Sequence, residues 1–263
     1  MISLGIIFEG EKEDGKGILF LADRGILTKR RLVYEGVNLK MLNKNPSIVI
    51  AFPGVSTAIQ ADFALRTGEF FLSNKIQDCA DFGDKLHKLH HCYKDMTKFY
   101  TEGEEGLLTD FLLGISDKEG DVELCYVKIG EDFAFEILSD YSNYGLTLFG
   151  ERETGLFIKE VITKFERENL PINFEVAFEL AIMSIKLVEK LYRMVSPKFD
   201  ICVLQKGDVS FIPYENIEKD GVVSFIDAKK DAIFKLLFDL IEFPEPENVK
   251  KVYDLIFKQK EDR

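Results

Sequence analysis

The first third of the chain changes from a strand-like to a helix-like hydrophobic pattern near residue 54. Four apolar runs, bounded by polar or glycine-containing turns, occupy residues 2–8, 17–23, 31–42 and 47–52. Short runs of this kind predict strands. From Val55 the apolar side chains recur at every third or fourth position. This spacing predicts one helix to about residue 73 and a second over 82–96.

The same change is repeated further along the chain. Apolar runs at residues 108–116, 122–130, 133–140 and 144–150 predict four strands in a meander. Helical spacing follows over 151–168, and again from Asn173, a candidate N-cap, to about residue 194. A hairpin is predicted over 199–214, with helices over 228–242 and 248–259. The helix after Asn173 is apolar around most of its circumference, so we expect it to lie between a sheet and other helices.

This order of elements indicates an α+β protein. Two sheets whose outer faces are covered by helices would bury all of these apolar faces. The predicted fold is therefore a four-layer α-β-β-α sandwich. Residues 1–215 are expected to form its core, and residues 216–263 a C-terminal helical extension packed on the same domain.

Composition and charge argue against several classes of partner and location. The net charge of −12 argues against nucleic acid and against an anionic membrane surface. Neither a membrane span nor a signal peptide is indicated, because no run of about 18 apolar residues occurs. The four cysteines lack CxxC spacing, which favours a reduced, cytoplasmic location. No cofactor is predicted.

Three stretches together resemble one known family. They are LGIIF at 4–8, GILFLADRG at 17–25, and LKMLNKNPSIVIAFPGVSTAIQADFA at 39–64. Asp23 and Arg24 end the second of these strands, and Lys40 stands fourteen residues before Gly54, which opens the first helix. This ordered set is similar to proteasome subunits, a branch of the N-terminal-nucleophile (Ntn) hydrolases, over about residues 1–215.

The resemblance implies a set of catalytic roles. In active members the first residue attacks the scissile carbonyl, and the free α-amine takes the proton. A lysine held by an aspartate lowers the pKa of the nucleophile, and the N–H of the helix-start glycine binds the oxyanion. Carried onto this chain, the aspartate is Asp23, the lysine Lys40 and the glycine Gly54. With Met1 they would line a cleft between the two sheets.

Other positions depart from the family's pattern. Met1 occupies the nucleophile position, and a thioether cannot act as a hydroxyl does. Glu151, Tyr192 and Leu27 stand where the family has serine, aspartate and threonine. Non-catalytic α-type subunits commonly keep the lysine and the glycine. We therefore expect a structural or binding subunit, assembled as a homo-oligomer or with proteasome-like ring partners, because this fold usually works in rings.

Two alternatives to this interpretation remain. Asp23 and Lys40 could form a buried structural ion pair in place of a catalytic pair. Alternatively, removal of Met1 and Ile2 would expose the amine of Ser3, making the chain an active peptidase or amidohydrolase with Ser3 as nucleophile. A shift of two residues keeps the same face of the strand but moves the nucleophile along it.

Two further segments, both expected at the surface, are candidates for a functional role. His87 and His91 are four residues apart, a spacing that a metal can use, so a metal-binding regulator is a third possibility. The simpler expectation is that both lie on a solvated helix face. The charged hairpin at 9–17 is expected to be a solvated turn, or a cap over the site.

Overall fold

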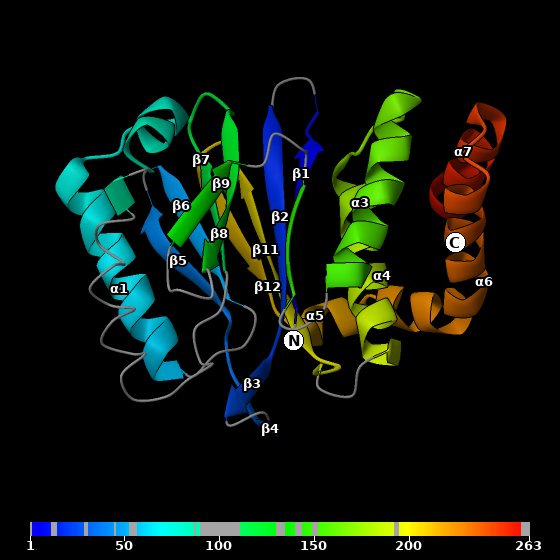
Figure 1. Ribbon diagram of the computed structural model, residues 1–263, viewed down its shortest axis with the longest axis horizontal. Coiled ribbons are helices and arrows are strands. Elements are labelled where there is room, and N and C mark those ends of the chain that lie inside the picture. The colour runs from blue at the N-terminus through cyan, green and yellow to red at the C-terminus, as the bar shows by residue number, and fades with distance from the viewer. Residues whose placement is uncertain are drawn as a thin grey trace.

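Two five-stranded antiparallel sheets form the centre of the molecule (Figure 1). The computed structural model describes residues 2–11, 15–28, 31–44, 46–52, 57–86, 88–89, 111–129, 135–139, 144–148, 152–191 and 195–258. The first sheet has the order β10-β1-β2-β11-β12. Its strands are β1 (Ile2–Glu9), β2 (Lys16–Asp23), β10 (Tyr144–Leu148), β11 (Phe199–Gln205) and β12 (Asp208–Ile212).

The second sheet has the order β5-β6-β7-β8-β9. Its strands are β5 (Leu39–Lys44), β6 (Ser47–Ala51), β7 (Phe111–Ser116), β8 (Val122–Ile129) and β9 (Phe135–Ser139). A separate hairpin pairs β3 (Gly25–Thr28) with β4 (Arg31–Glu35). The single strand expected over 31–42 is therefore wrong. The N–H of Gly36 still bonds to the carbonyl of Arg24 beside β3, at 2.8 Å, and after it the chain leaves this hairpin and enters the second sheet as β5.

The expected meander is only partly correct. Strands β7, β8 and β9 pair in sequence order in the second sheet. Strand β10 instead joins the first sheet, where Leu148 lies opposite Ile2 and Leu146 opposite Leu4. Hydrophobic alternation does not specify which strand a segment will pair with, so this change of sheet was not visible in the sequence.

The helices follow the predicted spacing with two differences. Their bounds are α1 (Thr57–Asn74), α3 (Arg152–Arg167), α4 (Phe174–Leu191), α5 (Tyr214–Lys219), α6 (Val222–Glu242) and α7 (Pro246–Tyr253), with a π-helical turn η1 (Asp254–Lys258) and helical residues 79–86. Asn173 caps α4 as predicted, because its Oδ1 accepts the N–H of Val176 at 3.0 Å. Helix α5 and the first turn of α6 were missed, since α5 buries only Ile217 and offers no periodic signal.

Three hydrophobic clusters connect these elements. The first contains Leu4 of β1 with side chains of α3, α4, α6 and α7. The second contains Ile50 of β6 with side chains of α1 and of residues 79–86. The third contains side chains of both sheets, including Phe20 of β2 and Leu112 of β7. In Figure 1, α1 accordingly lies beside the second sheet and α3 and α4 beside the first.

The helices that follow residue 215 share the first of these clusters. Ile217, Ile226, Leu237 and Val252 are buried in the same cluster as Ile2 of β1. The division of the chain at residue 215 remains a prediction.

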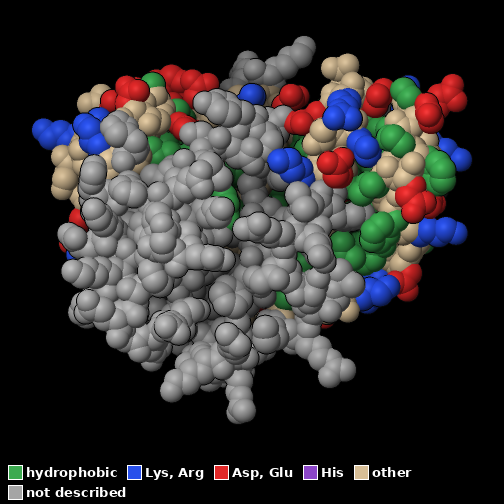
Figure 2. Space-filling model, in the orientation of Figure 1, with side chains coloured by type: hydrophobic (Ala, Val, Ile, Leu, Met, Phe, Trp, Pro, Cys, Tyr) green, Lys and Arg blue, Asp and Glu red, His purple; other side chains and the backbone are tan. Residues whose placement is uncertain are grey.

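Figure 2 shows acidic and basic side chains intermixed with small apolar areas on the side of the molecule formed by α3, α6 and α7. Among the described residues, no helix has the length and apolar character needed to cross a membrane.

Candidate functional site

Asp23, the last residue of β2, is fully buried and accepts three backbone hydrogen bonds. Its Oδ1 accepts the N–H of Ile2 at 2.8 Å. Its Oδ2 accepts the N–H of Ser196 at 3.1 Å and that of Gly25 at 3.3 Å. The carboxyl therefore joins the start of β1, the start of β3 and the segment that follows α4.

Burial and hydrogen bonding act on this carboxyl in opposite directions. Removal from water raises the pKa of Asp23 above its usual value, because the charged form loses its hydration. The positive charge of the N-terminal amine lowers this pKa, and the N–H groups of Ile2, Ser196 and Gly25 add to that effect, since all of them stabilise the carboxylate. A buried carboxyl with donors from three segments has the environment of a structural acceptor.

Asn38 extends this arrangement to the chain that enters the second sheet. It is buried, and its Nδ2 donates to the carbonyl of Asp23 at 2.5 Å and to that of Gly25 at 3.1 Å. The sequence analysis did not select Asn38. A single amide next to the β5 run was the only signal for it, and such residues are common in turns.

Arg24 links the same corner to β11 and α5. Its Nη2 lies 2.6 Å from Asp200 Oδ1, and its Nη1 lies 2.6 Å from Glu215 Oε1. The hydrogen bonds to Glu215 and Asp200 raise the pKa of Arg24, and the bond from Arg24 lowers the pKa of Glu215 to about 2. Asp200 also accepts the N–H of Tyr214 at 3.2 Å. The guanidinium of Arg24 thus binds two carboxylates, Asp200 and Glu215, that are far from Arg24 in the sequence.

Lys40 of β5 points away from Asp23. The register places Lys40 opposite Ile50, whose side chain packs in the cluster with α1, and residues directly opposite share a face. Its Nζ donates to the carbonyl of Val37 at 3.1 Å, and partial burial lowers the pKa of Lys40. Asp23 is on the other sheet, on the face that Leu21 shares with α4.

The structure therefore does not bring Asp23 and Lys40 together. Within the described part of the chain, no hydrogen bond or ion pair joins the two side chains. The alternative of a buried ion pair between them is wrong. Each side chain instead bonds to main-chain atoms near it, Asp23 to three N–H groups and Lys40 to the carbonyl of Val37.

Ser3, the alternative nucleophile, is fully buried within β1. It lies between two paired strands, opposite Ala22 of β2 and opposite Thr147 of β10. Ala22 packs in the cluster between the sheets, so Ser3 is on the face directed toward the second sheet. Asp23 is on the opposite face, beside Ile2.

Leu27 lies in β3, opposite Leu32 of β4, whereas the remaining predicted positions lie outside the described residues. These are Met1, Gly54, His87, His91, Glu151 and Tyr192. Among the residues that the structure does describe, no group of three or more His, Cys, Asp or Glu side chains could hold a metal ion. The roles of Gly54 and of the two histidines remain predictions.

Comparison with solved structures identifies the kind of fold that the chain has. No family model matches the sequence, and no curated protein matches it. Among solved structures, the chain is similar to Anbu (ancestral beta-subunit) from Yersinia bercovieri, with a TM-score of 0.61 at 12% sequence identity. The likeness covers 89% of this chain and 97% of that one. The fold of this chain is therefore proteasome-like.

Proposed function

We propose that the chain is a proteasome-subunit-like protein that serves as a non-catalytic, structural or binding member of an Ntn-fold assembly. The observation that carries this proposal is the bonding of Asp23. Its two oxygens accept main-chain N–H groups, and Lys40, on the other sheet, donates to the carbonyl of Val37 just before its own strand. The aspartate–lysine pair that would lower the pKa of a nucleophile is thus not formed.

The candidate nucleophiles support the same proposal. Met1 stands at the aligned nucleophile position, and its thioether has no proton to lose and no lone pair of alkoxide strength. Ser3 is fully buried between Ala22 and Thr147. In the chain that still carries Ile2, the Ser3 side chain is therefore closed to a substrate carbonyl.

We further infer that the layers form the α-β-β-α sandwich of this fold. The three hydrophobic clusters support it, because one fills the space between the sheets and the other two join each sheet to its own helices. The chain would assemble with copies of itself or with proteasome-like partners in the cytoplasm. Leu65 and Leu72, seven residues apart on α1, support an assembly, since they are 60% and 67% exposed on one helix face.

Native mass spectrometry at micromolar concentration tests the assembly. We expect one closed oligomer, and we expect Leu72→Ser to reduce its population, with Leu65→Ser acting alike. Ser73→Ala, an exposed neighbour on the same helix, is the matched control. A wild-type protein that is monomeric at every concentration tested would contradict the assembly.

A panel of fluorogenic peptide amides tests the lack of catalysis. We expect the same rate of hydrolysis for wild type and Ser3→Ala, equal to that of a buffer blank. A wild-type rate above the blank that disappears in Ser3→Ala would establish the hydrolase alternative.

A further inference from the structure

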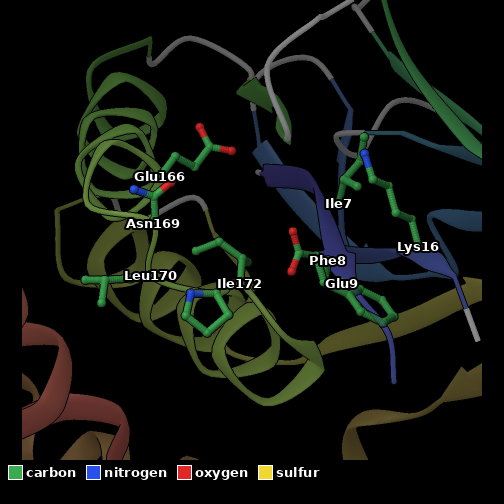
Figure 3. Close-up of a pocket in the computed structure, with 9 residues that line it drawn as sticks. Ile7, Phe8, Glu9, Lys16, Glu166, Asn169, Leu170 and Ile172 are labelled. Carbon is green, nitrogen blue, oxygen red and sulfur yellow. The ribbon is translucent and has the colours of Figure 1, made fainter. Parts of the chain in front are cut away.

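A cavity of about 330 Å³ lies at the far end of β1 from Asp23. It is between the last residues of β1 and the turn that joins α3 to α4 (Figure 3). In the β1–β2 ladder Ser3 is opposite Ala22 at one end and Glu9 opposite Lys16 at the other. Six residues of strand correspond to about 20 Å, so this cavity is separate from the Asp23 corner.

One polar atom in the wall of this cavity lacks a partner. The Oε1 atom of Glu166, on the last turn of α3, is buried and has no hydrogen-bond partner among the described residues. Figure 3 shows the carboxylate of Glu166 directed from the helix toward β1, and that of Glu9 directed from the strand toward the helix. A buried acceptor without a donor is unfavourable, so a ligand that supplies the donor removes that penalty.

The other residues that line the cavity indicate what kind of hydrogen-bond donor it would bind. The lining contains two carboxylates, Glu9 and Glu166, and one basic side chain, Lys16, so its net formal charge is negative. Phe8, Leu170 and Ile172 add apolar surface to the lining, and Figure 3 shows Ile172 between Glu166 and Glu9. Burial raises the pKa of Glu166, as is usual for a carboxyl that lacks a cation. A positively charged donor on an apolar stem matches this combination.

The walls are fixed before any ligand enters. The N–H of Glu9 bonds to the carbonyl of Ile172 at 2.8 Å, which joins β1 to the turn before α4. The hydroxyl of Tyr253 donates to the carbonyl of Pro171 at 2.6 Å, which joins the same turn to α7. Small-molecule sites are usually largely preformed cavities of about 300–1,000 Å³, and this one is within that range.

From this geometry we propose that the cavity binds a primary alkylammonium group, with Glu166 as its anionic partner and Ile172 beside its alkyl stem. Such a group could come from a free alkylamine or from a lysine side chain of a peptide. The site does not depend on the proposed role of the protein as a subunit.

Titration of the isotopically labelled full chain with n-butylamine, followed by amide chemical shifts of Asn169 and Leu170, tests the proposal. We expect saturable shifts in wild type, a dissociation constant at least tenfold larger in Glu166→Gln, and no change in Glu168→Gln. Glu168 is a neighbouring carboxylate that does not line the cavity, and the glutamine at 166 keeps the side-chain shape. n-Butanol, which has the stem without the charge, should not produce the shifts.

A second arm identifies the source of the amine. Nα-acetyl-lysine amide should bind like n-butylamine if the site takes lysine side chains, and should not bind if it takes only free amines. The proposal is overturned if n-butylamine does not bind wild type. It is also overturned if Glu166→Gln binds the amine as well as wild type does, or if n-butanol produces the same shifts.

Discussion

The backbone N–H of Ile2 donates to Oδ1 of Asp23 at 2.8 Å, which ties the first residue of β1 to the last residue of β2. The resemblance to proteasome subunits assigns this aspartate to a lysine. In this chain it accepts main-chain donors from three segments instead. The position therefore has a structural use that does not require catalysis.

Asp23→Ala should lower the free energy of unfolding by about 3 kcal/mol or more. The substitution leaves the N–H groups of Ile2, Ser196 and Gly25 without an acceptor, and each buried unpaired group costs about 1–3 kcal/mol. Asp23→Asn keeps one acceptor oxygen, so its loss should be smaller. Urea unfolding measures both, and a loss below about 1 kcal/mol for Asp23→Ala would show that the N–H groups find water or another acceptor.

Lys40 and Asp23 should be energetically independent. Lys40→Met removes one bond to the carbonyl of Val37 and keeps the apolar stem, so we expect a loss of about 1 kcal/mol or less. A double-mutant cycle with Asp23→Asn should give a coupling within about 0.5 kcal/mol of zero. A coupling of about 2 kcal/mol would mean that the two charges interact directly.

Glu215 should make stability depend on acid pH. Its pKa is lowered from 4.5 to about 2 by the bond from Arg24, so the unfolded chain binds more protons than the folded one at intermediate pH. The contribution is complete above about pH 4.5 and is lost as the pH falls through about 2. Because Glu215 is exposed, solvent screening keeps the effect modest.

The comparison that isolates this effect is Glu215→Gln against Glu242→Gln, an exposed carboxylate near the end of α6. Urea unfolding at pH 6 and pH 3 should show less acid sensitivity in Glu215→Gln than in wild type. Glu242→Gln should keep the wild-type sensitivity. Equal sensitivity in all three proteins would be evidence against the ion pair with Arg24.

Gly114→Ala should be destabilising by about 1–3 kcal/mol, because overpacking a core has costs of this size. A Cβ at this position in β7 would lie 2.5 Å from Cζ of Phe20 on the facing sheet. Gly68→Ala, in α1, meets only the carbonyl of Leu42 at 3.6 Å, so it should stabilise by up to about 1 kcal/mol. Thermal and urea unfolding compare the two, and a neutral Gly114→Ala would contradict close packing between the sheets.

Local pattern predicted the elements better than their pairing. Strand β2 and the cap at Asn173 were predicted because alternation and capping depend on neighbouring residues. The break between β4 and β5 was missed because the run 31–42 is apolar on both sides of Gly36. The transfer of β10 to the first sheet was missed because partner choice depends on contacts distant in the sequence.

In the candidate site, too, the contacts between residues that are distant in the sequence could not be predicted. Asp23 and Arg24 could be selected because they match the Asp-Arg element that ends the second strand in the resemblance to proteasome subunits. Their partners Ser196, Asp200 and Glu215 are more than 170 residues away, and nothing in their local sequence marks them. The opposite faces of Asp23 and Lys40 follow from strand register, which the sequence did not specify.

The most direct test of the proposed non-catalytic role is the intact mass of the purified protein, read together with N-terminal sequencing. We expect a chain that still carries Ile2 ahead of Ser3, since the N–H of Ile2 is bound to Asp23 in β1. A chain that instead begins with a free amine on Ser3 would contradict this proposal and establish the processed hydrolase.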